Sequence, residues 1–142
     1  MVTLGYLVVQ IRQNNKMLSS SVYGSWVVTA NQTLELLAVH AEPLAAMYEG
    51  TRSFNSLTPV EQRIHTAYFV GVMNVYEAAY FNYLDGAIQQ TMHDAKCRNL
   101  VRLFRTTPLL RESWSRGSSE LFDDRFVDYV EHEVFSKIEA TA

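Results

Sequence analysis

The 142-residue sequence contains only one cysteine and three prolines. The single cysteine, Cys97, excludes a disulfide within the chain and most cysteine-based zinc sites. No segment alternates polar and apolar residues, so we expect no β-sheet. The net charge of −3 argues against nucleic-acid binding by overall electrostatic attraction. What is present, 48% apolar and 19% charged residues, is typical of one globular domain with a sizeable core.

Motifs that carry catalysis are also absent. The sequence has no Gly-rich phosphate loop, no G-x-S-x-G elbow and no H-E-x-x-H motif. Three pairs have the i,i+4 spacing that places two side chains on one helical face: Glu61 with His65, His93 with Cys97, and Asp128 with His132. Each supplies two ligands where a metal site needs three or four. Lys96 and Arg98 beside Cys97 can lower a thiol pKa, but a lone helical cysteine is usually inert. We therefore expect no metal, cofactor or catalytic residue.

The chain is organised around an apolar stretch over residues 58–84. Thr58 and Glu61 form a capping box, and Pro59 suits the first helical position. Gly86 lies just beyond the end, where a helix commonly stops. The strongly polar residues after Thr66 are only Asn74, Glu77 and Asn82. A membrane span is the alternative at this length, but a charge near its middle opposes that reading. The stretch therefore predicts the buried central helix of a helical domain.

Helical periodicity covers the rest of the chain. The pattern predicts one long helix from near Thr3 to about Val39 and an all-α bundle of four longer helices with two short connecting ones. The other expected helices run over 44–48, 87–104 and 109–116, followed by a last helix that Ser118 or Ser119 caps and whose buried stripe extends from Phe122 to Ile138. Gly24 and Gly71 are small enough to allow the first and central helices to cross closely.

The N-terminal residues permit two interpretations. Residues 1–11 are apolar, and Arg12 and Lys16 follow. This order is that of the second half of a membrane helix with basic residues on its cytoplasmic side. An amphipathic first helix, with Leu4 and Ile11 on one face, explains the pattern equally well. On the first interpretation residues 1–16 are the remnant of a membrane anchor, and residues 17–142 form a single helical domain.

The aromatic residues of the central helix suggest a pocket. His65, Tyr68, Tyr76 and Tyr80 could line a site for an apolar ligand. Aromatic residues at this spacing are also what a plain core contains, with buried hydroxyl groups seeking partners. We expect His65 to be buried and hydrogen-bonded to one protein group.

The basic segment offers a surface. Arg98, Arg102 and Arg105 are spaced by four and three residues, so a helix places them on one face. Such a face would attract anionic lipid headgroups or an acidic partner. The alternative is that these arginines pair within the fold with acidic residues of the last helix, namely Asp123, Asp124 and Asp128.

The order of features resembles a family. VVQIRQNN follows an apolar stretch, then come EPLAAMYEG, an aromatic-rich helix that ends at Gly86, TPLLRESWSR and FVDYVEH. This order is similar to that of a widespread group of small, uncharacterised bacterial proteins with one N-terminal membrane helix and a helical domain behind it. That group has no assigned activity, so the resemblance implies no catalytic residue. The upstream half of its membrane helix is not in this sequence.

Together these features lead to one functional hypothesis and one alternative. The first is a non-enzymatic helical domain associated with the cytoplasmic face of the inner membrane, or cytoplasmic if Met1 is the native start, which acts through protein or lipid contacts. The alternative is a ligand-binding or sensor domain with an aromatic-lined pocket. Expected partners are a protein, an anionic membrane surface or a second copy of the chain, and not a nucleic acid.

Overall fold

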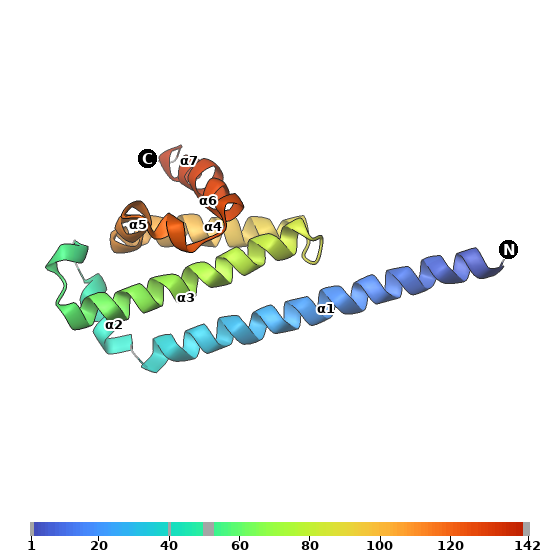
Figure 1. Ribbon diagram of the computed structural model, residues 1–142, viewed down its shortest axis with the longest axis horizontal. Helices are drawn as coiled ribbons and strands as arrows, with labels where there is room; N and C mark the ends of the chain where they lie inside the picture. The colour runs from blue at the N-terminus through green and yellow to red at the C-terminus, as the bar shows by residue number, and fades with distance from the viewer. Residues whose placement is uncertain (1, 40, 50–52, 141–142) are drawn as a thin grey trace.

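The computed structural model describes residues 2–39, 41–49 and 53–140, and within them every regular element is helical. The chain is therefore all-α, as the periodicity predicts (Figure 1). The helices are α1 Val2–Val39, α2 Ala41–Tyr48, α3 Pro59–Leu84, α4 Gln90–Thr106, α5 Pro108–Ser115, α6 Asp124–Tyr129 and α7 Phe135–Glu139. Two 3₁₀ turns, Phe54–Ser56 and Ser118–Leu121, lie between them.

Helix α3 starts and stops where its sequence indicates. The Thr58 amide donates to the Glu61 carboxylate at 2.7 Å, and the Glu61 amide donates to the Thr58 hydroxyl at 3.3 Å. This capping box satisfies two amide groups that the first turn otherwise leaves without a partner. At the other end Gly86 adopts a positive φ of 72°, a conformation that favours glycine.

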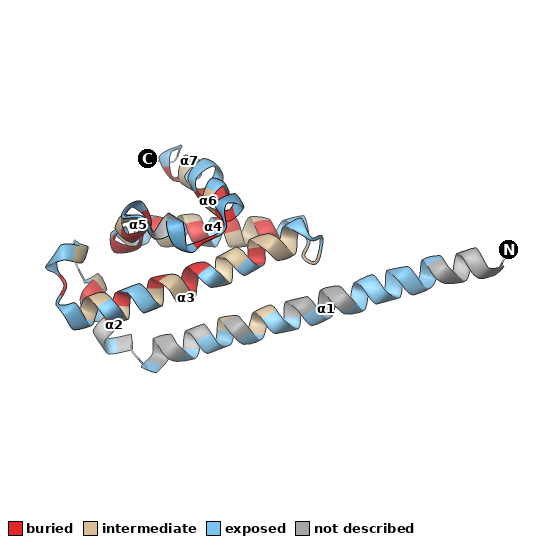
Figure 2. Ribbon diagram, in the orientation of Figure 1, coloured by how far each residue is buried: buried red, intermediate tan, exposed pale blue. Residues whose placement is uncertain are grey.

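The core lies between α3 and the C-terminal helices (Figure 2). Leu100 of α4, Leu110 of α5 and Phe126 of α6 are fully buried there. Trp114 stacks on Phe122 with ring centroids 5.7 Å apart. A smaller cluster, formed by Leu44, Met47, Leu57 and Leu109, joins α2 to α5 and to the segment just before α3. The stacking of Trp114 on Phe122 stabilises the fold by more than the burial of the two rings alone.

Helix α1 lies alongside α3 in its C-terminal half and projects past the end of α3 in its N-terminal half (Figure 1). The indole nitrogen of Trp26 donates to the Val75 carbonyl at 3.1 Å and ties the two helices together. The ammonium group of Lys96 lies 4.0 Å from the centre of the Trp26 ring, which adds a cation–π contact with α4. Every residue over 8–17 is exposed.

Three details differ from the sequence-based expectations. Gly24 is exposed, and a Cβ there would meet nothing within 4 Å, so it does not mark a close helix crossing. Helix α4 begins at Gln90 and not at residue 87. The last helix is capped by Asp123, whose carboxylate accepts from the Arg125 amide at 2.9 Å. Its two α-helical parts, α6 and α7, are joined by a π-helical turn, Val130–Val134.

One structural observation bears on the interpretation of the N-terminal residues as part of a membrane helix. Among the described residues, no helix combines the length and the apolar character that crossing a bilayer requires.

Candidate functional site

His65 lies at the meeting point of α2, α3 and α5. Its ring is fully buried, with Nδ1 2.8 Å from the Tyr48 hydroxyl and Nε2 2.6 Å from the Ser113 hydroxyl. The predicted burial is confirmed, but the ring bonds to two protein groups and not to the single group expected. Tyr48 and Ser113 are 17 and 48 residues away in sequence, so no local pattern identified them.

Burial sets the charge of this cluster. It lowers the pKa of His65 from 6.5 to about 4, although the Glu112 carboxylate acts in the opposite direction. Burial and the neighbouring Tyr68 raise the pKa of Tyr48 well above its usual value of 10. His65 is therefore neutral at pH 7, with one ring nitrogen donating and the other accepting.

The pairing of His65 with Ser113 has the separation of a catalytic base and its nucleophile, but other features of such a site differ. A tyrosine hydroxyl occupies the position where a carboxylate would orient the imidazole and stabilise its charged form. The nearby Glu112 instead accepts from the Phe54 amide at 3.0 Å and lies 3.8 Å from the Arg116 guanidinium. The cluster therefore serves to connect three helices through buried hydrogen bonds.

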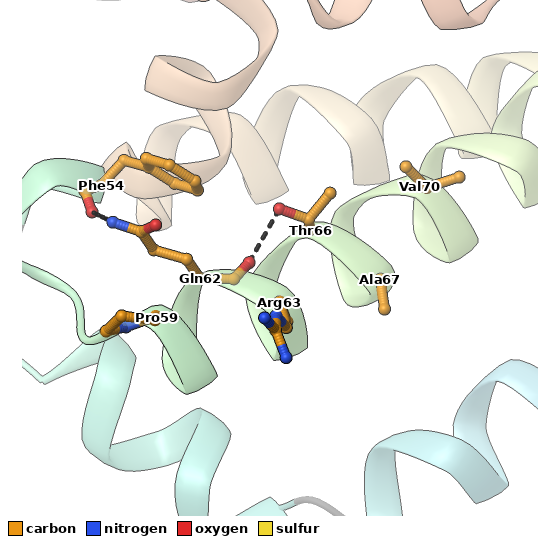
Figure 3. Close-up of a pocket in the computed structure, with 7 residues that line it drawn as sticks. All are labelled: Phe54, Pro59, Gln62, Arg63, Thr66, Ala67 and Val70. Carbon is orange, nitrogen blue, oxygen red and sulfur yellow. Dashed lines mark hydrogen bonds between the residues drawn. The ribbon is translucent and has the colours of Figure 1, made fainter.

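An open groove of about 700 Å³ runs along α3 beside this cluster (Figure 3). It is lined by Phe54, Pro59, Gln62, Arg63, Thr66, Ala67 and Val70. The Gln62 amide nitrogen donates to the Phe54 carbonyl at 3.3 Å and fixes one wall. Phe54 and Thr66 also border a smaller cavity of about 180 Å³, which Ser113 and Arg116 line from α5 and its end.

The structure distributes the four predicted pocket residues along α3 and does not bring them to this groove. Tyr68 lies against Tyr48 with ring centroids 5.7 Å apart, and Tyr80 stacks on Tyr129 at 4.5 Å. Tyr76 is partly buried at the edge of the main core. Burial raises the pKa values of Tyr68, Tyr76 and Tyr80. Their rings fill the margin of the core.

Cys97 is buried, and its sulfur contacts a residue that the sequence did not suggest. Its sulfur accepts from the Lys137 ammonium group of α7 at 3.3 Å, while Lys96 lies over Trp26. His93, one turn before Cys97, stacks on Tyr83 with ring centroids 3.9 Å apart. In the part of the chain that the structure describes, no three His, Cys, Asp or Glu side chains gather closely enough to hold a metal ion.

The predicted basic face is present on α4. Arg98, Arg102 and Arg105 are all exposed. Asp123, which the alternative interpretation assigned as a partner for these arginines, forms an ion pair with Arg125 at 3.1 Å. The side chains of Asp124 and Asp128 are exposed.

The most unusual surface is the projecting half of α1. Its described apolar side chains are all exposed: 45% for Val8, 52% for Val9, 57% for Ile11 and 65% for Met17. Contiguous exposed apolar side chains mark interaction sites for proteins or membranes. Arg12 and Lys16 are interspersed among them and are also exposed.

Comparison with known proteins gives no match to this chain among protein-family models, curated proteins or solved structures. Its function therefore has to be inferred from its own geometry.

Proposed function

We propose that this chain is a non-enzymatic helical domain that associates with the cytoplasmic face of the inner membrane through the projecting half of α1. One observation carries the proposal: every residue over 8–17 is exposed although this stretch contains Val8, Val9, Ile11 and Met17. An isolated helix of this length is marginal in water, so the segment gains stability from a surface that covers it. The basic residues among the apolar ones favour a surface with anionic headgroups.

The magnitude is sufficient for reversible membrane binding. Burying an aliphatic side chain completely contributes about 1.5–3 kcal/mol, so two such side chains give about 3–6 kcal/mol. Arg12 and Lys16 near an anionic surface add about 1 kcal/mol each. The total is close to that of a single myristoyl chain, which binds with a constant of about 10⁴ M⁻¹. A second contact, such as the arginine face of α4, would make the association longer-lived.

A flotation assay with phospholipid vesicles tests the proposal. The chain should float with vesicles that contain about one-third anionic lipid, and Val9→Asp should reduce the bound fraction several-fold. Val60→Asp is the matched control, because Val60 is 64% exposed at the start of α3, at the other end of the molecule (Figure 1). Equal flotation of the two variants, or no flotation of the unmodified chain, would contradict the proposal.

The sensor hypothesis has less support. His65 is held by Tyr48 and Ser113, and Tyr80 is stacked on Tyr129. A ligand along these residues would have to displace core contacts that are already made. The open groove beside them is lined by other residues of α3.

A further inference from the structure

Two phenylalanine rings and one arginine side chain line the cavity of about 180 Å³ beside α5. Its walls come from the turn before α3, from α3 itself, and from α5 and the turn after it; they are Phe54, Thr66, Phe69, Ser113, Arg116 and Leu121. A cavity of about 150 Å³ holds one benzene molecule, so this one has room for a single aromatic ring with a short substituent. None of the four residues predicted to form a pocket lines it.

The two phenylalanine rings of this cavity are held in place by other rings. Phe69 is 1% exposed and lies edge-on to Phe122, with ring centroids 6.2 Å apart. Phe54 is partly buried and lies edge-on to His65 at 5.9 Å. Aromatic rings attract one another in edge-on and offset arrangements. A ring that enters the cavity therefore meets aromatic surface that is already in position.

The guanidinium group of Arg116 is fixed at this cavity by its neighbours. Its Cζ lies 4.8 Å from the centre of the Phe54 ring, and its Nη1 donates to the Asn55 side-chain carbonyl at 3.0 Å. Nη1 also lies 3.8 Å from the Glu112 carboxylate, which accepts from the Phe54 amide. Among the described residues, the other two nitrogens of the group, Nε and Nη2, have no hydrogen-bond partner.

Arg125 shows what the Nε and Nη2 edge of a guanidinium group recognises. In that residue the same two nitrogens donate to the two carboxylate oxygens of Asp123, at 3.1 Å and 3.3 Å. This bidentate pairing matches the planar geometry of both groups. The Glu112 carboxylate does not pair with Arg116 in this way, because 3.8 Å is too long for a hydrogen bond. The corresponding edge of Arg116 is therefore suited to a carboxylate from outside the chain.

We propose that this cavity binds a small aromatic carboxylate, with its ring against Phe54 and Phe69 and its carboxylate on Nε and Nη2 of Arg116. The open groove along α3 meets the cavity at Phe54 and Thr66 and gives the ligand a way in. A ligand of about eleven non-hydrogen atoms should bind here with a dissociation constant on the order of 1 mM. The site shares no residue with the projecting half of α1, so the proposal goes beyond the membrane contact and does not depend on it.

An NMR titration of the isotopically labelled whole chain, in lipid-free buffer, tests whether the ligand has to be charged. The probes are 3-phenylpropionate and 3-phenylpropionamide, which has the same shape and no charge. The carboxylate should bind about ten-fold more tightly, because hydrogen bonds to an ionised group are the stronger ones, and should shift the backbone resonances of Phe54, Thr66 and Ser113. Equal affinities, shifts confined to other residues, or no binding at about ten times the expected dissociation constant would overturn the proposal.

Two arginine variants locate the carboxylate of the probe. Arg116→Gln should abolish the preference for the carboxylate over the amide; this ratio is the readout because it does not change if the substitution merely loosens the cavity. Arg63→Gln is the matched control, since Arg63 is exposed and lines the groove but not the cavity, and it should keep the full preference. A preference that persists in Arg116→Gln, or that Arg63→Gln removes, would overturn the proposal. A chain that shows the predicted ratios and binds no vesicles would contradict the membrane contact alone.

Discussion

Lowering the pH from about 6.5 to about 4 should destabilise this protein, and a defined part of that loss should come from His65. Burial holds the ring neutral in the folded state down to a pKa of about 4, whereas in the unfolded chain it takes up a proton near 6.5. Between these values the unfolded state binds more protons, so the free energy of unfolding falls as the pH falls. The difference of about 2.5 pKa units corresponds to about 3 kcal/mol, lost at up to about 1.4 kcal/mol per pH unit. A domain of this size has about 5–15 kcal/mol in total.

The assay is urea unfolding, followed by circular dichroism, at half-unit steps from pH 7 to pH 4. His65→Gln can still hydrogen-bond but does not titrate, so its stability should fall with pH by about 3 kcal/mol less than that of the unmodified chain. Carboxylate protonation affects both proteins and cancels in this difference. His132→Gln, which changes an exposed histidine, is the matched control for the substitution itself. Parallel pH profiles for the unmodified chain and His65→Gln would refute a neutral, buried His65.

Two further predictions concern the cap of α3 and the face of α4. Thr58→Ala should lower the free energy of unfolding by about 1 kcal/mol, as measured by urea unfolding, because it removes the hydroxyl that accepts from the Glu61 amide; an unchanged midpoint would mean that the capping box does not stabilise the helix. Replacing Arg98, Arg102 and Arg105 together by glutamine should weaken flotation with anionic vesicles at low salt by roughly 5-fold per residue and leave the melting temperature within about 2 °C; a lowered melting temperature with unchanged flotation would show that the arginines act within the fold.

The helices were predictable because their signals are local. The capping box at Thr58 and Glu61 and the glycine after α3 involve neighbours within a turn, so the sequence alone places that helix correctly. The sequence predicts Ser118 or Ser119 as the cap of the last helix, because serine is favoured at that position, whereas the structure uses Asp123. Several acceptable caps in one segment compete, and tertiary packing selects among them.

The site was less predictable because it depends on long-range contacts. The burial of His65 follows from its place on an apolar face, but Ser113 reaches it from 48 residues away. Nothing in the local sequence distinguishes Ser113 from the exposed Ser115 of the same helix except the face that it occupies. The π-helical turn before α7 likewise has no local sequence signal that we recognise.

The sequence supports two interpretations of the projecting half of α1 and does not decide between them. The apolar residues before Arg12 fit either an amphipathic first helix or the second half of a membrane helix. The structure shows that every residue over 8–17 is exposed. The periodicity of a helix reveals which residues share a face and not whether another element covers that face.

The most direct test of the membrane contact is the depth of Val9 when vesicles are added. A Val9→Cys variant carrying an environment-sensitive fluorophore is titrated with anionic vesicles, with Val60→Cys as the control at the far end of the molecule; the buried Cys97 stays unlabelled. Association through α1 predicts a blue shift at position 9 that nitroxide-labelled lipids quench, and no change at position 60. An emission spectrum at position 9 that stays as it is in water would contradict the proposed function.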